Sequence, residues 1–428
     1  MSAPSRRPDA AQSLRVPAFI ALIAFLLRIA WIVLGHTYKF KTADGNFSFG
    51  WEMGRIGAAL ASGHGFGNPF GPPTGPTAWE PPLYPYLIAA VFHLFGIYSK
   101  TSAFVLLAFN SACSALTCIP IFLIARRTFS ENVARWSAWA WALLPNVIFW
   151  CTRAVWETSL SALLLALIVW LALTLEDRDG RLPWIEFGLL WGIAALNSAS
   201  LLSFLPAAGL WVWHYQEKRR RARLGKRSIA GVAVASLVFF ACITPWLVRN
   251  YETFGKFIFI RDNFGAELRL GNGNGADGTW MEYLHPSQDV YALRQYQSMG
   301  EPAYVALRKQ QAIEYIRADY SRFAGLCFKR FVYYWAAPPK ATQPPWMSEV
   351  KNSLFLASSV LAFWGLGRAL RLRKPGTGLL FWLILLYPAI YYIVFPAPRY
   401  RVPIEPEMAI LCVFLITEAG KKTLRVAA

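Results

Sequence analysis

The sequence has few charged residues for its length. Only 16% of its 428 residues are Asp, Glu, Lys or Arg, whereas an average soluble domain has roughly 25%. Hydrophobic residues make up 56% of the chain, which is enough for around ten membrane spans of ~20 residues each. The composition excludes an ordinary water-soluble globular protein and predicts an all-α polytopic membrane protein.

Cysteine patterns and internal repeats are missing as well. None of the six cysteines belongs to a CxxC pair or to a Cys/His ligand pattern, and five of them lie in apolar stretches. The sequence therefore predicts no disulfide framework and no cysteine-ligated metal. It also lacks a fixed-period repeat and a duplicated half, although many secondary transporters are built from two related halves.

Basic residues exceed acidic ones and give a formal net charge of +19. Beside apolar spans this excess is a topology signal, so no nucleic-acid partner is predicted. Arg6, Arg7 and Arg15 precede an apolar run at 17–34 that is longer than a signal-peptide core and has no convincing cleavage site after it. This run is predicted to be a retained first helix with its N-terminus inside.

The apolar run 83–98 is short for a span and contains Pro85 and His93. If it does not cross, the later basic clusters all fall on the side of the N-terminus, and if it crosses, they all move outside. We therefore predict a re-entrant or interfacial helix here. Ten transmembrane helices are then predicted, with both termini cytoplasmic, at 17–35, 101–125, 136–151, 158–176, 184–199, 200–215, 228–247, 353–371, 376–395 and 403–419.

These spans divide the chain into three parts. They are an N-terminal transmembrane module at 1–248 with a first outer loop at 36–100, a large, partly helical outer loop at 249–352, and C-terminal transmembrane helices at 353–428. The segment 301–335 has a helical pattern and is predicted to lie over the outer face, because Lys329 and Arg330 would be costly at mid-bilayer. We expect the functional residues in the two outer loops.

The first outer loop contains an amphipathic pattern. Apolar residues at 49, 53, 56 and 60 predict a helix with one stripe on the membrane surface, and Glu52 and Arg55 occupy its other face. These two residues are either a solvated ion pair or a carboxylate and a cation beside a lipid-linked substrate. The following Gly- and Pro-rich segment embeds Phe70 and Trp79, which predicts a folded loop packed on the bilayer, and its Glu80 is either a surface carboxylate or a site residue.

Three motifs in this order resemble the GT-C glycosyltransferases of the family 39 type, which includes protein O-mannosyltransferases and the aminoarabinose transferases of lipid A. They are Trp51-Glu52-Met53-Gly54-Arg55-Ile56, Glu80-Pro81-Pro82-Leu83 and Arg399-Tyr400-Arg401-Val402-Pro403-Ile404-Glu405-Pro406. Members of this family usually open the surface helix with Asp-Glu, which this chain lacks at that place. The resemblance implies that the catalytic base is Glu52 or Asp44.

Sugar transfer from a polyprenyl phosphate needs a base for the acceptor hydroxyl and cations for the leaving phosphate. Arginines at the outer ends of the predicted spans could bind this phosphate or only snorkel to the interface. Glu157 could also simply pair with Arg153. The predicted substrate-binding residues are Arg55, Glu80, Arg153, Glu157, Arg249, Arg399, Tyr400 and Arg401.

The residues predict no metal site. His285 and Asp277 are isolated, and the outer loops contain no Asp-x-Asp pair. Some GT-C enzymes use a divalent cation, so a cation stays an open alternative, and no other cofactor is predicted. The glycine-rich segment 270–278 is expected to be a flexible turn, because no Lys-Ser or Lys-Thr follows it.

These observations predict a multi-pass glycosyltransferase of the plasma (inner) membrane. It would move a hexosyl or pentosyl group from a polyprenyl-phosphate donor to a lipid, glycan or protein acceptor on the outer, periplasmic face, with general-base assistance and inversion. Membrane lipids would surround it. The alternative is a secondary transporter or lipid flippase without glycosyl transfer, which would place charges at mid-bilayer, where Arg28 is the clearest example.

Overall fold

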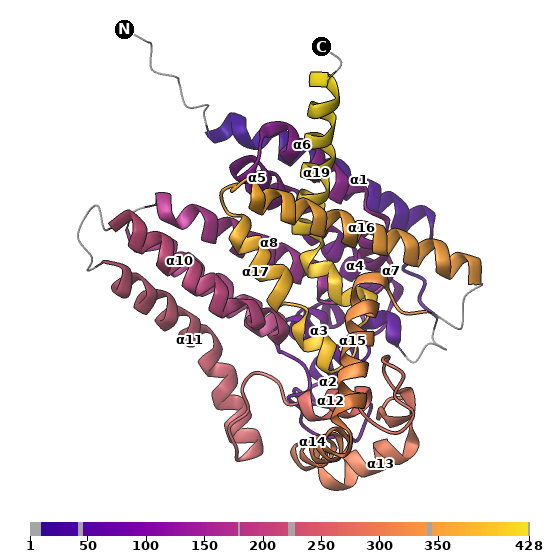
Figure 1. Cartoon of the computed structure of the whole chain (residues 1–428). Coiled ribbons are helices and arrows are strands. Elements are labelled where there is room, and N and C mark those ends of the chain that lie inside the picture. The colour runs from indigo at the N-terminus through magenta and orange to yellow at the C-terminus, as the bar shows by residue number, and fades with distance from the viewer. Residues whose placement is uncertain (1–9, 42–45, 179, 221–226, 340–344, 427–428) are drawn as a thin grey trace.

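The computed structural model describes residues 10–41, 46–178, 180–220, 227–339 and 345–426. Within these ranges the chain is helical and forms no strand, only an isolated antiparallel bridge between Gly67 and Pro76. The predicted all-α class is therefore confirmed. In Figure 1, the first turns of α1 (Ala10–Leu34) and the end of α19 (Glu405–Val426) lie at one end of the molecule, and the outer-loop helices lie at the other.

Helices form at all ten segments predicted to cross the membrane, but only four stretches are long and apolar enough to span it by themselves. These stretches support a membrane location, while ten crossings stay a prediction. The four are Leu14–Leu34, Lys100–Thr128, Ile229–Phe254 and Glu349–Arg371. They belong to α1, to α4 (Lys100–Leu116) with α5 (Cys118–Thr128), to α11 (Arg227–Phe254) and to α16 (Pro345–Arg371).

A proline explains why one predicted span is broken. The predicted helix at 136–151 consists of α6 (Glu131–Leu143) and α7 (Pro145–Arg153), because Pro145 forces Leu144 into an extended conformation. Pro388 lies between α17 (Thr377–Leu386) and α18 (Ala389–Ile393), but Tyr387 and Pro388 keep helical dihedral angles there, so the backbone continues its helical course. A hydropathy window averages over a break such as the one at Pro145, so the sequence analysis predicted one continuous helix at 136–151.

The remaining apolar helices form the central bundle. Gly188 and Gly192 let one of them, α9 (Leu182–Asn197), approach α11 closely, because a Cβ at Gly188 would lie 2.3 Å from the carbonyl oxygen of Ala235. The predicted boundary between the spans 184–199 and 200–215 corresponds to the end of α9 at Asn197, where Ser198 is extended. These elements are α8 (Thr158–Thr174), η3 (Leu175–Asp177), α9 (Leu182–Asn197), η4 (Ala199–Phe204), α10 (Leu205–Arg220) and η6 (Pro398–Ile404).

The outer loops fold into short helices. The first loop forms η2 (Phe47–Phe49), α2 (Glu52–Ala61) and α3 (Leu83–Phe95), and the second forms α12 (Phe264–Gly271), η5 (Glu282–Leu284), α13 (Val290–Met299), α14 (Glu301–Ala318) and α15 (Tyr320–Ala336). The helical pattern at 301–335 is confirmed, with a break at Asp319, whose side chain caps α15. Arg330 of α15 is fully buried and donates to Asn272 and to the carbonyl oxygen of Ile393.

The Gly- and Pro-rich segment is folded, as predicted, but it does not rest on the bilayer with its aromatic residues. Phe70 and Trp79 are buried against Tyr296 and Tyr304 of α13 and α14. Glu301 fixes this arrangement, because its carboxylate accepts hydrogen bonds from the Thr77 hydroxyl, the Ala78 N–H and the Tyr296 hydroxyl. The two outer loops therefore form one packed unit.

Candidate active site

A tight turn positions Glu52, the first residue of α2. Gly50 and Trp51 both have positive φ values, 83° and 47°. A Cβ at Gly50 would lie 2.4 Å from the carbonyl oxygen of Val155, so only glycine fits this approach. The Val155 N–H donates back to this turn at 2.8 Å. The contact fixes the first outer loop against the segment between α7 and α8, which carries Glu157.

Glu52 lies inside the protein, with 5% of its surface exposed, so the predicted alternative of a solvated ion pair is wrong. Its Oε1 accepts a hydrogen bond from the Ser287 hydroxyl at 3.4 Å and lies 3.5 Å from His285 Nε2. Burial raises the pKa of Glu52 above its ordinary value, and Arg55 and Arg399 oppose this rise only in part. The result is a carboxylate that is more basic than an exposed one.

His285 is a neutral partner for this carboxylate. Burial, with a smaller contribution from Arg55, lowers the pKa of His285 to about 3. The Ser287 N–H donates to His285 Nδ1 at 3.2 Å, so the neutral ring carries its proton on Nε2, which faces Glu52. The ring also stacks on Trp51 at 5.4 Å. His285 can therefore steady Glu52 without adding a positive charge that would make it a weaker base.

Arg55 joins the same group from the next turn of α2. Its Nη1 donates to the Ser287 hydroxyl at 2.8 Å and to the Pro69 carbonyl oxygen at 3.4 Å. Ser287 thus connects Arg55 to Glu52. These contacts place a half-buried guanidinium beside the candidate base.

Glu80 is also buried, so the alternative of a surface carboxylate is wrong. Its Oε1 lies 3.5 Å from Nη2 of Arg261, whose Nε donates to the Trp79 carbonyl oxygen at 3.2 Å. Burial raises the pKa of Glu80 to about 8, Arg261 opposes this rise, and Glu52 and Glu157 add to it. Glu80 therefore keeps its proton near neutral pH, whereas Arg261 stays charged.

Arg399 brings a guanidinium to these carboxylates from the C-terminal part of the chain. It lies 4.1 Å above the Trp156 ring, and its Nη2 donates to the Tyr400 hydroxyl at 3.3 Å. Burial would lower the pKa of Arg399, but Tyr400, Glu157 and Glu52 outweigh it and raise the pKa. Arg399 is thus held as a cation by the negative charges around it.

Glu157 and Glu267 complete the group. Burial raises the pKa of Glu157, and Arg399 and Arg261 oppose this rise, so these two arginines are its electrostatic partners rather than Arg153. Glu267 of α12 accepts a hydrogen bond from Asn263 at 2.9 Å. Burial raises the pKa of Glu267 to about 7. Glu267 can therefore exchange a proton near neutral pH.

Together these side chains form what we call the charged cluster. It combines four carboxyls with shifted pKa values and three guanidiniums, brought from four separate segments of the chain. Such a group offers proton acceptors beside cations suited to a phosphate. Its members are Glu52, Arg55, Glu80, Glu157, Arg261, Glu267 and Arg399.

Two arginines predicted to bind substrate use their guanidiniums in contacts within the protein. Arg401 is buried and bonds to Glu405, to Ser358 and Ser359 and to the Phe355 carbonyl oxygen, so it joins α16 to α19.

Arg249 donates to the carbonyl oxygens of Thr77 and Phe66 and braces the first outer loop. The sequence placed both arginines at span ends but could not show which carbonyls their side chains reach.

The remaining predicted site residues lie at different positions relative to the charged cluster. Arg153 is exposed, with its guanidinium 5.5 Å from the Phe149 ring, and has no place in the charged cluster. Tyr400 lies at the edge of the cluster through Arg399 and stacks on Tyr391 at 4.6 Å. Asp44 lies outside the described residues.

The sequence missed Arg261, Glu267, His285 and Ser287. Each lies alone in the second outer loop without a motif around it, so no local signal indicated its role. For metals, the described part of the chain contains no group of three or more His, Cys, Asp or Glu side chains arranged to hold an ion. A divalent cation therefore stays an untested alternative.

Comparison with known proteins gives three findings. Residues 79–248 match the model of the family described as dolichyl-phosphate-mannose-protein mannosyltransferase. No curated protein matches by sequence. The structure is similar to the apo oligosaccharyltransferase of Archaeoglobus fulgidus, with a TM-score of 0.55 and 14% identity over 97% of this chain and 51% of that chain. The chain therefore shares its fold with this oligosaccharyltransferase.

A second structure of this enzyme, AglB in complex with an inhibitory peptide and a dolichol-phosphate, gives a TM-score of 0.53 with 14% identity over 97% of this chain and 52% of that one. The chain thus spans about half the length of these relatives. ArnT from Cupriavidus metallidurans bound to undecaprenyl phosphate has a TM-score of 0.38 and 13% identity over 95% of this chain and 78% of that one, too low a score to indicate a shared fold by itself. The resemblance seen in the sequence motifs is confirmed.

Proposed function

We propose that this protein transfers a sugar from a polyprenyl-phosphate donor to an acceptor hydroxyl at the outer face of the plasma membrane. The observation that carries the proposal is the charged cluster within a GT-C fold, with a buried Glu52 of raised pKa beside arginines. The donor class is supported by the relatives, since the matching family is described by dolichyl-phosphate mannose and AglB was solved with a dolichol-phosphate. The acceptor is a lipid, a glycan or a protein.

In this mechanism Glu52 takes the proton of the acceptor hydroxyl. The acceptor oxygen attacks the anomeric carbon, and the bond from that carbon to the phosphate oxygen breaks, with inversion. Polyprenyl phosphate leaves with the electron pair of this bond, and Arg399 and Arg261 stabilise its negative charge. His285 keeps Glu52 in place and stays neutral throughout.

The transporter or flippase alternative would place charged residues at mid-bilayer, and Arg28 is the clearest example. The contacts of Arg28 give this alternative little support. Arg28 is fully buried and donates to the Ser114 hydroxyl and to the carbonyl oxygens of Ala24 and Ala142. It therefore ties α1 to neighbouring helices. A structural anchor of this kind does not need a transported substrate.

The decisive experiment offers membranes that contain the protein a panel of polyprenyl-phosphate hexoses and pentoses. Free polyprenyl phosphate and sugar-modified acceptor are measured, and membranes with the Glu52→Gln variant are the matched control. We expect one donor to be consumed only in the parent membranes. If no donor is consumed, and a fluorescent lipid-linked sugar is instead moved across the bilayer, the flippase alternative is correct.

We also propose that both termini are cytoplasmic and that the first outer loop is periplasmic, with α3 as a re-entrant or interfacial helix. The thirteen-residue length of α3 and its buried face are consistent with this arrangement. A reporter fused after Lys100 should therefore indicate the outside. A cytoplasmic signal from this reporter would contradict the assignment of α3.

A further inference from the structure

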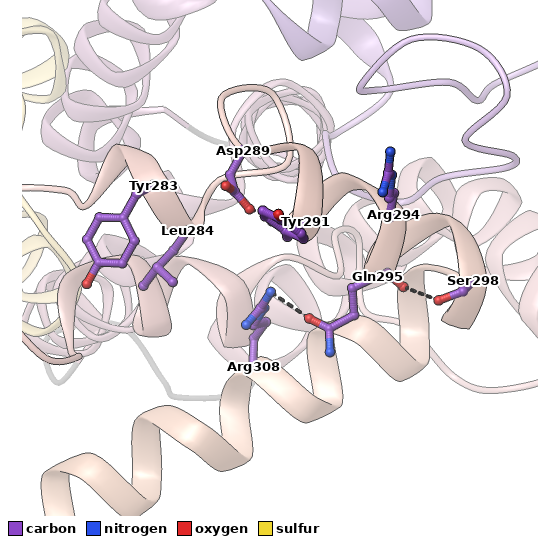
Figure 2. Close-up of a pocket in the computed structure, with 9 residues that line it drawn as sticks. Tyr283, Leu284, Asp289, Tyr291, Arg294, Gln295, Ser298 and Arg308 are labelled. Atoms are coloured by element: carbon purple, nitrogen blue, oxygen red, sulfur yellow. Dashed lines mark hydrogen bonds between the residues drawn. The ribbon is translucent and has the colours of Figure 1, made fainter.

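A pocket built from other residues than the charged cluster lies on the outer helices. It has a volume of about 610 Å³ and opens between η5, α13 and α14 (Figure 2). Its lining includes Tyr283, Asp289, Tyr291, Arg294 and Arg308. In the proposed topology these helices face the periplasm, where an acceptor would arrive.

Arg308 of α14 is a buried cation of this pocket. Only 8% of its surface is exposed, and its guanidinium donates to the amide oxygens of Gln295 at 2.8 Å and Gln311 at 3.0 Å. The guanidinium also lies 4.7 Å from the centroid of the Tyr304 ring. All three partners are neutral, and no carboxylate within the described ranges lies at ion-pairing distance from Arg308. A buried charge is costly unless it is paired, so an anion in the pocket would complete this site.

The rim of the pocket adds a second cation and aromatic surface. Arg294 is exposed, and Tyr291 has 79% of its surface exposed. The acidic residue of the lining, Asp289, accepts the Ala292 N–H at 2.7 Å and caps α13. Exposed tyrosine rings offer an apolar face with a polar edge, and arginines offer paired donors to an acidic group.

We propose that this pocket is an acceptor subsite for an anionic saccharide. Arg308 and Arg294 would bind its acidic group, and Tyr291 would contact the sugar ring. This inference rests on the proposed function, because the saccharide is the acceptor of the transfer. The pocket is connected to the base through the chain, because Tyr283 lines it and His285, two residues later, lies 3.5 Å from Glu52. A ligand bound in the pocket would therefore restrain the segment 283–285, which contains the His285 that contacts Glu52.

The test measures binding to the full-length protein without any donor, by calorimetry in detergent. The probes are a disaccharide that contains glucuronic acid and its neutral glucose counterpart. We expect the acidic probe to bind at least ten times more tightly, and Arg308→Gln and Arg294→Gln each to weaken it by about tenfold, the usual effect of losing a charge-assisted hydrogen bond. Arg317→Gln removes the same charge from an exposed position of α14 and should bind like the parent.

Arg294→Gln alters an exposed side chain, so it tests the pocket even if Arg308→Gln fails to fold. The proposal is overturned if the acidic probe does not bind, if both probes bind equally, or if Arg294→Gln and a folded Arg308→Gln both bind like the parent. Donor consumption is measured separately on the same samples. Selective binding without donor consumption would reject the proposed function alone, and donor consumption without selective binding would reject this subsite alone.

Discussion

The two outer loops contribute to the charged cluster in different ways. The first loop supplies Glu52 and Glu80, together with Arg55, from motifs that are recognisable in the sequence. The second supplies Arg261 and Glu267, and it adds His285 as a neighbour of Glu52 outside the cluster. Arg261 and His285 stand alone in the sequence and contact residues of the first loop. In the proposed mechanism, the first loop therefore carries the proton acceptor, while the second holds that acceptor in place and adjusts the charge around it.

The strongest test of this division is removal of the base. Glu52→Gln keeps the size of the side chain and removes the proton acceptor, so transfer should fall by ~10²- to 10⁴-fold while donor binding is retained. Glu314→Gln, an exposed position on α14, is the control. Rates and donor affinity are measured in reconstituted membranes. If Glu52→Gln turns over normally while Asp44→Asn is inactive, the base is Asp44.

The next test concerns the arginines that the proposed mechanism assigns to the leaving phosphate. Arg261→Gln and Arg399→Gln should each lower transfer by roughly ten- to a hundredfold, because each removes a charge-assisted contact. Arg153→Gln removes the same charge from an exposed position and should leave the rate unchanged. Equal effects of all three variants would show that total charge matters, and not the cluster.

A smaller effect is expected from His285, which acts through Glu52. His285→Ala should lower the rate by about tenfold, the order of one hydrogen bond to a charged group. It also admits water, so the raised pKa of Glu52 should return toward its ordinary value and the acidic limb of the pH-rate profile should move to lower pH. His285→Gln keeps an N–H donor and should recover part of the rate. A fall in rate without a shift of this limb would indicate only a structural role.

The difference between the loops also explains what the sequence could predict. Glu52 and Arg55 were found because helical spacing and neighbouring motifs are local. Arg401 and Arg399 show the limit of such information. They are two residues apart in one motif, yet Arg399 lies among the carboxylates, whereas Arg401 bonds to Glu405 and joins α16 to α19.

The helices were predicted from hydropathy, which depends on composition alone. The break at Pro145 was missed because a hydropathy average does not depend on backbone geometry. The role of Arg261 depends on how the chain returns to the first loop after α11. No pattern within the second outer loop contains that information.

The smallest expected effect is that of Glu80, and it depends on pH. Burial raises its pKa from an ordinary 4.5 to about 8, so at pH 6.5 the side chain is neutral and Glu80→Gln should change the transfer rate little. The raised pKa also determines how the stability of the folded protein changes with pH. Between pH 4.5 and 8 the unfolded chain loses the Glu80 proton while the folded protein keeps it, so this group lowers the free energy of unfolding as the pH rises and adds no further change above pH 8.

Glu80→Gln has no proton to lose, so the variant should gain thermal stability relative to the parent between pH 5 and pH 8.5. Melting temperatures measured in one detergent across this range, with Glu314→Gln as the exposed control, test the effect. A difference between variant and parent that does not change with pH would mean that Glu80 is already ionised and paired with Arg261 at neutral pH. The first loop would then present two charged carboxylates to the donor phosphate, and Arg261 would serve chiefly to neutralise Glu80 rather than to bind the leaving group.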